Sequence, residues 1–304
     1  IYLKNEEEIE LLRENNLLVS RTLAEVGRHI RPGVTTKELD RIGEEFIRSH
    51  GAVPAFLGYQ GYPASLCISV NEQVVHGIPS TSQVLKEGDI VSVDCGTFMK
   101  GFVGDSAYTF AVGAVSDEVK QLMEVTKEAL YKGTAQGWKS RGDISAAVQE
   151  YAEKFGYGVV RELEGHGLGR KMHEDPGVPN YGARGRGPLL REGMVICIEP
   201  MINMGTRAVV FEPDVGLVEG RRRDVTADQD FVVGLGRQPE IDAVIARLRI
   251  VAHVGVFGGE IAVGQHREVF VLHPLERKDL RFAVVLVVEL HVVAHVGRLG
   301  GIQP

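Results

Sequence analysis

The pattern of apolar and polar positions predicts helices in two parts of the chain. Between Glu6 and Ile30, apolar residues recur three or four positions apart, and Pro32-Gly33 follows as a helix stop. The next segment, Thr35-Thr36-Lys37-Glu38, resembles a capping box, in which Thr35 is the N-cap and Glu38 reaches back. It predicts a second helix that runs to about His50. Two more amphipathic helices are predicted over residues 117–131 and 144–155.

Short apolar runs that predict strands are interspersed with these helices. Residues 89–98 and 102–112 read as two strands joined by a hairpin turn at Lys100-Gly101. Residues 58–63 and 71–79 are predicted as a loop and a turn, and residues 165–176 as a flexible, glycine-rich segment. Because hairpins accompany the helices, an α+β fold fits better than a doubly wound parallel sheet. Further strands are predicted over residues 66–70, 158–161 and 193–198.

Composition narrows the class of protein. The 304 residues are 44% hydrophobic and 25% charged, which is typical of one large globular domain or two smaller ones. The net charge of -7 argues against direct binding of nucleic acid. Three widely spaced cysteines without a CxxC motif suggest neither a disulfide framework nor a thiolate zinc site, and they fit a reducing cytoplasm.

Neither end of the sequence predicts membrane targeting. The charged opening, residues 4–8, does not resemble a signal peptide. The most apolar run, residues 282–296, contains Glu289 and is shorter than the about 20 residues that a membrane span requires. We therefore expect a cytoplasmic protein with no membrane partner.

The composition changes beyond about Pro213. From there to Pro304 the chain has no Ser, Asn, Tyr, Cys, Met or Trp, and Lys278 is its only lysine. Such a bias is unusual for a selected domain. The sequence therefore predicts a division into residues 1–214 and an atypical Val/Arg-rich tail, residues 215–304.

Four acidic or imidazole side chains form a candidate metal site. Asp94 lies in an apolar strand, where an unpaired carboxylate is costly, and Asp105 lies on the return strand. His166 stands between two glycines, and Glu199 ends an apolar strand before a proline. Singly, each suits a salt bridge, a turn or a strand end. Together they form an oxygen-rich set with one imidazole, which suits Mn, Fe(II), Co or Zn, and bridging carboxylates suit two metal ions.

Two further histidines remain for other chemistry. His76 lies in the turn VVHGIP, and His173 follows His166 by seven residues. Either could handle a proton or hold a substrate carbonyl.

Four segments together identify a family resemblance. Residues 61–79, 88–110, 165–176 and 192–203 resemble bacterial type I methionine aminopeptidases, and the resemblance runs from Glu6 to about Asp214. It implies a pita-bread α+β fold with pseudo-twofold symmetry, a metallo-aminopeptidase domain over residues 1–214, and two divalent metal ions (Co, Mn, Fe or Zn). It also implies removal of the N-terminal methionine of nascent polypeptides, near the ribosome, by a monomeric enzyme that uses a hydroxide bridging the metals.

The resemblance also implies roles for particular residues. Asp94, Asp105, His166 and Glu199 would be metal ligands, with Asp105 bridging. The remaining residues would contact substrate: His76 beside the N-terminus and scissile bond, His173 at the carbonyl or tetrahedral intermediate, and Tyr59, Tyr62, Cys67 and Met172 around the methionine side chain.

The chain departs from the family at its C-terminal end. The family has a fifth ligand, a bridging Glu in a Glu-His-Thr or similar triplet, and its place by counting is Asp230. The expected tryptophan after Asp214 is replaced by Val215-Gly216. We hypothesise that a frameshift replaced the native C-terminus. That predicts a fold that is incomplete at its C-terminal end and an impaired enzyme.

Two other functions fit parts of the pattern. An aminopeptidase P or prolidase-like enzyme shares the fold but carries an additional N-terminal domain. A noncatalytic pita-bread protein that binds peptides or a partner would account for a lost metal ligand.

Overall fold

The computed structural model describes residues 1–136, 139–211, 218–220, 226–228 and 231–234. The helices are α1 (Glu6–Gly27), α2 (Thr36–Ser49), α3 (Asp117–Thr134) and α4 (Arg141–Glu153), with a short 3-10 helix over Tyr59–Gly61. The strands are β1 (Val53–Pro54), β2 (Leu66–Val70), β3 (Gln73–Val75), β4 (Ile90–Met99), β5 (Phe102–Ala111), β6 (Gly158–Val159), β7 (Glu164–Gly167), β8 (Glu174–Pro179), β9 (Val195–Ile198), β10 (Met201–Asn203), β11 (Val209–Phe211), β12 (Val218–Gly220), β13 (Thr226–Asp228) and β14 (Phe231–Gly234).

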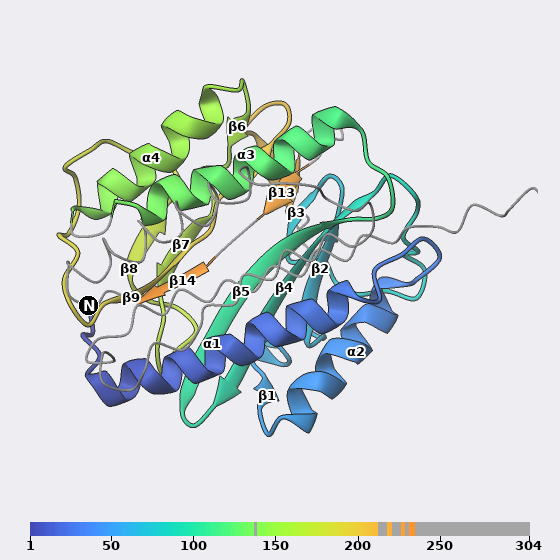
Figure 1. Cartoon of the computed structure of the whole chain (residues 1–304), viewed down its shortest axis with the longest axis horizontal. Helices are drawn as coiled ribbons and strands as arrows, with labels where there is room; N and C mark the ends of the chain where they lie inside the picture. Colours follow the sequence, from blue (N-terminus) through green and yellow to red (C-terminus); the bar gives the residue numbers. More distant parts are fainter. Residues whose placement is uncertain (137–138, 212–217, 221–225, 229–230, 235–304) are drawn as a thin grey trace, which may run out of the picture.

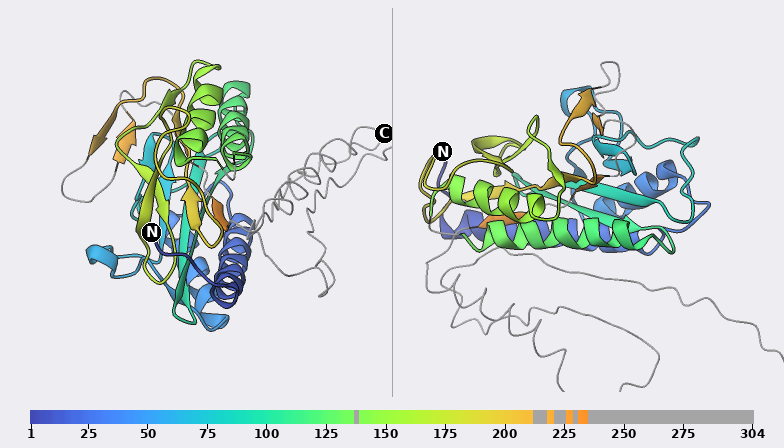
Figure 2. Two further views of the ribbon diagram at one scale, coloured as in Figure 1. Left: turned by 90° about the vertical axis from the view of Figure 1, so that its left-hand side faces the viewer. Right: turned by 90° about the horizontal axis from the view of Figure 1, so that it is seen from above.

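The architecture consists of two halves of similar build (Figure 1). In the first half, α1 and α2 pack on a sheet in which β4 lies between β1 and β2 and also pairs with β5. In the second half, α3 and α4 pack beside an antiparallel sheet of order β14-β9-β7-β8. Both helix pairs lie on the same face of the strands (Figure 2). The predicted α+β class is confirmed.

The two N-terminal helices begin at side-chain caps. Asn5 Oδ1 accepts from Glu8 N at 2.9 Å, and Glu8 Oε2 accepts from Asn5 N at 3.1 Å, which is a complete capping box for α1. Thr35 caps α2 as predicted. The Glu38 carboxylate does not complete the predicted capping box and binds Arg41 instead. Arg41, one turn along the helix, offers this carboxylate two N–H donors, whereas the cap offers one.

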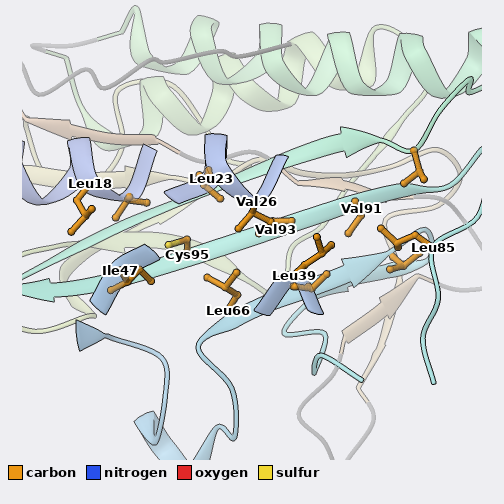
Figure 3. Packing of buried hydrophobic residues seen from close by; sticks show 14 of the residues in the cluster. Leu18, Leu23, Val26, Leu39, Ile47, Leu66, Leu85, Val91, Val93 and Cys95 are labelled. Carbon is orange, nitrogen blue, oxygen red and sulfur yellow. The ribbon is translucent and has the colours of Figure 1, made fainter. Parts of the chain in front are cut away.

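The main core of the first half lies between these helices and the β4 sheet (Figure 3). Because α1 repeats apolar residues at helical spacing, one face of the helix is buried along its whole length. The labelled side chains in Figure 3 include Leu18, Leu23 and Val26 of α1, Leu39 and Ile47 of α2, and Val91, Val93 and Cys95 of β4.

Two segments that we predicted as irregular contain strands. The glycine-rich segment 165–176 contributes to β7 and β8, and the turn 71–79 includes β3. The glycines of β7 serve close packing rather than flexibility. A Cβ at Gly165 would lie 2.3 Å from Cys197 O of the neighbouring strand β9, so a larger residue cannot occupy this position.

Among the described residues, three short strands lie beyond position 214. β12 pairs with β11, β13 with β10, and β14 with β9, where Phe231 stands opposite Ile198. The division at 214/215 and the frameshift stay predictions. Asp230, Val215-Gly216 and most of the tail lie outside the described residues. Within the described part of the chain, the helices are too short or too polar to cross a membrane.

Candidate active site

The β4–β5 hairpin presents two carboxylates on one face. Asp94 stands opposite Ala107, and Asp105 stands opposite Gly96, so the two aspartates are diagonal neighbours across the strand pair. The main-chain N–H of Asp105 donates to Asn16 Oδ1 of α1 at 3.0 Å. The helix side chain thus fixes the outer edge of the strand at the position of this carboxylate.

The second half contributes an imidazole and a third carboxylate. His166 of β7 has its Nε2 atom 3.2 Å from Glu199 Oε1 and 3.7 Å from Asp105 Oδ2. Its Nδ1 lies 2.9 Å from Gly167 O, and because a carbonyl only accepts, Nδ1 carries the proton. Burial lowers the pKa of His166 to about 4, so the ring is neutral near pH 7. Its Nε2 lone pair then points toward the carboxylates.

This donor set fits a divalent metal ion. A lone pair and several carboxylate oxygens that converge in a buried place repel one another unless a cation lies among them. One imidazole with carboxylates is a set that Mn, Fe, Co or Zn accepts. Ligand atoms of Asp105, His166 and Cys197 lie within 4.8 Å of one another.

Cys197 was not among the residues predicted for the site. The signal was the strand alternation in Val195–Ile198, because residues two positions apart point to the same side, which places Cys197 on the side of Glu199. Cys197 is fully buried in an apolar cluster, whereas Glu199 lines the open pocket. Glu199 is therefore the better candidate ligand.

Two histidines and a tyrosine stand above this centre. The ring centroids of His166 and His173 are 4.3 Å apart, and Tyr59 Oη lies 2.8 Å from His173 Nδ1. Partial burial, followed by the nearby His76, lowers the pKa of His173. His76 adopts a positive φ of 62°, a strained conformation that is frequent at functional sites.

A single pocket of about 570 Å³ brings all ten predicted site residues together. Tyr62 is fixed in its wall, since its hydroxyl lies 3.0 Å from Leu66 O and 2.9 Å from Gly77 O. Burial raises the pKa of both Tyr62 and Cys67, which keeps them neutral. The ten residues are Tyr59, Tyr62, Cys67, His76, Asp94, Asp105, His166, Met172, His173 and Glu199, and Phe56, Gln60, Gly61, Pro63 and Ile78, which the sequence did not suggest, complete the lining.

A buried cluster of carboxylates and imidazole in a pocket, held between two similar halves, suits metal-assisted hydrolysis. The chain belongs to metallopeptidase family M24, because the sequence model of that family matches residues 10–219. It is 53% identical over 244 residues to a methionine aminopeptidase of Clostridium acetobutylicum, covering 79% of this chain and 98% of the relative. It is 50% identical over 211 residues to methionine aminopeptidase 1 of Bacillus subtilis, covering 69% and 85%.

Solved structures agree with this assignment. The methionine aminopeptidase of Rickettsia prowazekii matches with a TM-score of 0.76 and 39% identity, covering 77% of this chain and 96% of that one. A prolidase from Pyrococcus furiosus matches with a TM-score of 0.61 and 23% identity, covering 77% and 62%, and shares the fold alone. The predicted pita-bread fold is confirmed, and the prolidase-like and noncatalytic alternatives are not favoured.

Proposed function

We propose that this protein is a metal-dependent methionine aminopeptidase that removes the N-terminal methionine of newly made polypeptides. The observation that carries the proposal is the approach of His166 Nε2 to the Asp105 and Glu199 carboxylates, at the base of a pocket with apolar walls. Relatives about half identical to this chain, which are named methionine aminopeptidases, support the same activity.

Asp94, Asp105, His166 and Glu199 would hold the metal. Two ions fit this proposal, because Asp105 is a diagonal neighbour of Asp94 and lies 3.7 Å from His166 Nε2, so that its carboxylate would serve both. Co, Mn, Fe and Zn all accept these donors. When bound, the metal supplies Lewis-acid polarisation of the scissile carbonyl and an activated water.

His173 would act on the substrate carbonyl. A Tyr59 hydroxyl that donates to His173 Nδ1 leaves the imidazole proton on Nε2. That proton can then be donated to the oxygen that becomes negatively charged in the tetrahedral transition state. The lowered pKa of His173 favours the neutral ring. In the neutral ring, the hydrogen bond from Tyr59 selects the tautomer with its proton on Nε2. His76, which lines the same pocket, would stand beside the substrate N-terminus and scissile bond.

The walls of the pocket account for a preference for methionine. Tyr62, Cys67, Met172 and the Phe56 ring belong to one apolar cluster that an unbranched thioether side chain can enter. A charged side chain would lose its hydration there without a paired group. We further propose that the substrates are nascent polypeptides and that the protein acts near the ribosome. It would act there as a monomer in the cytoplasm.

The test is a paired measurement of metal content and of methionine release from a Met-Ala peptide. We expect the protein to bind divalent metal and to release methionine, and His166→Ala to lose at least one ion. Absence of both metal and activity would contradict the proposal for this chain.

The C-terminal tail gives a second arm to that test. Asp230, the position that stands for the family's fifth ligand, is one methylene shorter than Glu. Two close cations need bridging anions, so we expect the second ion to bind weakly and activity to be low. A chimera that replaces all residues after Asp214 with a family-type tail containing Trp and Glu-His-Thr should restore activity. Full activity and two tightly held ions in the unaltered chain would refute the expected impairment.

A further inference from the structure

The segment that precedes α1 contacts the loop that carries two pocket residues. This loop, residues 168–173, joins β7 to β8 and contains Met172 and His173. The contacting residues lie before position 10, outside the region that matches the sequence model of family M24. None of these residues lines the pocket.

Lys4 makes the central contact. Its side chain is only 1% exposed, and its Nζ lies 2.7 Å from Oε2 of Glu174, the residue that follows His173. The other carboxylate oxygen, Oε1, accepts from Lys171 N at 3.2 Å, so Glu174 also holds the loop backbone. The main-chain N–H of Lys4 donates to Gly193 O at 2.8 Å. Lys4 is therefore fixed at its backbone and at its charge.

The packing around this ion pair leaves little room for adjustment. A Cβ at Gly169 would lie 2.5 Å from Glu174 Oε1 and 2.8 Å from Lys4 Cε. A second ion pair joins the loop to the first turn of α1, since Arg170 Nη2 lies 3.1 Å from Glu8 Oε1. The Arg170 guanidinium also stands 4.6 Å from the centroid of the Phe102 ring. Two ion pairs thus attach the loop and the start of β8 to the first eight residues of the chain.

Stability alone does not account for the buried pair. Removing an ammonium and a carboxylate from water is costly, and a buried ion pair is often no more stable than apolar residues of the same size. Burial raises the pKa of Glu174, but the hydrogen bonds from Lys4 and from the loop backbone outweigh it, so the carboxyl stays ionised. The pair instead fixes the orientation of the Glu174 side chain, because Lys4 Nζ binds one carboxylate oxygen and Lys171 N binds the other.

We propose that Lys4 is a positioning residue for the aminopeptidase reaction, which through Glu174 sets the place of His173 over the metal centre. The inference rests on the proposed function, in which His173 acts on the substrate carbonyl. The imidazole is held on one side by Tyr59 and on the other by its own backbone, whose next residue is Glu174.

The experiment removes both charges together in the full-length protein, with Lys4→Met and Glu174→Gln. We expect kcat for a Met-Ala peptide to fall about 10- to 100-fold, because small displacements of a catalytic group have effects of this size. KM should change less than kcat, since Phe56, Tyr62 and Cys67 of the methionine pocket lie outside this loop. Lys100→Met is the control: it removes an ammonium that pairs with Glu14 of α1 and takes no part in the Glu174 contacts, and it should leave both constants unchanged.

A measurement without metal separates this proposal from the proposed function. Two-dimensional NMR of the chelator-treated protein labelled with ¹⁵N-histidine reports each imidazole, and His173→Asn identifies the His173 signal. That signal should shift in the double variant and stay in place in Lys100→Met. An unshifted His173 signal with wild-type kcat would overturn the proposal. If the wild-type chain neither binds metal nor releases methionine, the proposed function fails, and the NMR comparison still decides the role of Lys4. If the double variant does not fold, the isosteric Glu174→Gln alone should shift the same signal, and no shift would overturn the inference.

Discussion

Asn16 joins α1 to the strand that carries Asp105, and its removal should weaken both the fold and the metal site. The side chain is 3% exposed; its Oδ1 accepts from Asp105 N at 3.0 Å and its Nδ2 donates to Leu12 O at 2.9 Å. In Asn16→Ala, the Asp105 N–H loses this acceptor inside a buried strand, and such losses cost about 1–3 kcal/mol. We expect a loss of about 2 kcal/mol, which corresponds to a fall in Tm of about 4–8 °C for a domain of this size.

The same change should reach the metal. If half of that free energy appears as displacement of the Asp105 carboxylate, the affinity for Mn²⁺ falls by about fivefold, because 1.4 kcal/mol is one factor of ten. Calorimetric titration of the chelator-treated protein with Mn²⁺ measures this, and thermal unfolding with and without metal measures the rest. Thr22→Ala is the control, since Thr22 is equally buried on α1 but donates only to the helix carbonyl of Leu18. Equal Mn²⁺ affinity in Asn16→Ala and Thr22→Ala would refute the reasoning.

Three further predictions concern the pocket and the loop. His173→Ala should lower kcat by about two to three orders of magnitude with unchanged metal content, whereas His166→Ala should lose metal; metal loss in the first variant would make His173 a ligand. Tyr59→Phe should lower kcat about 2- to 10-fold, because the variant loses one neutral hydrogen bond to His173, and KM should change little. A change in KM alone would show that Tyr59 only lines the pocket. Since the pKa of Glu174 is lowered from 4.5, its ionised form stabilises the fold above that pH and the contribution is lost as pH falls through the folded pKa. The Tm difference between wild type and Glu174→Gln should therefore shrink as the pH falls below 4.5. A Tm difference that stays constant with pH would exclude this linkage.

The sequence predicted the elements whose signal is local. The hairpin of β4 and β5, the strand β2 and the four long helices follow from apolar periodicity and turn residues, and the structure has them within a few residues of the expected bounds. The candidate site was predicted as a set because its residue types are costly to bury without a purpose. All ten of its members line one pocket.

What the sequence did not predict depends on contacts between distant segments. The glycines around His166 suggest flexibility in a linear reading, but they permit close approach of β7 to β9. Lys4 and Glu174 are 170 positions apart, so nothing local indicates that their charges meet. Cys197 escaped notice because a buried cysteine in an apolar run resembles any core residue.

The division of the metal ligands between the two halves has a consequence for how the protein matures. Asp94 and Asp105 come together as soon as their hairpin forms, but His166 and Glu199 reach them only when the second half has docked. A metal ion that binds only the assembled site therefore stabilises the docked state of the two halves. At a free metal concentration one hundred times the Kd, this stabilisation is about 2.7 kcal/mol. Metal supply in the cell would then control the amount of assembled protein as well as its activity, so metal depletion would expose the chain to proteolysis before it limited catalysis.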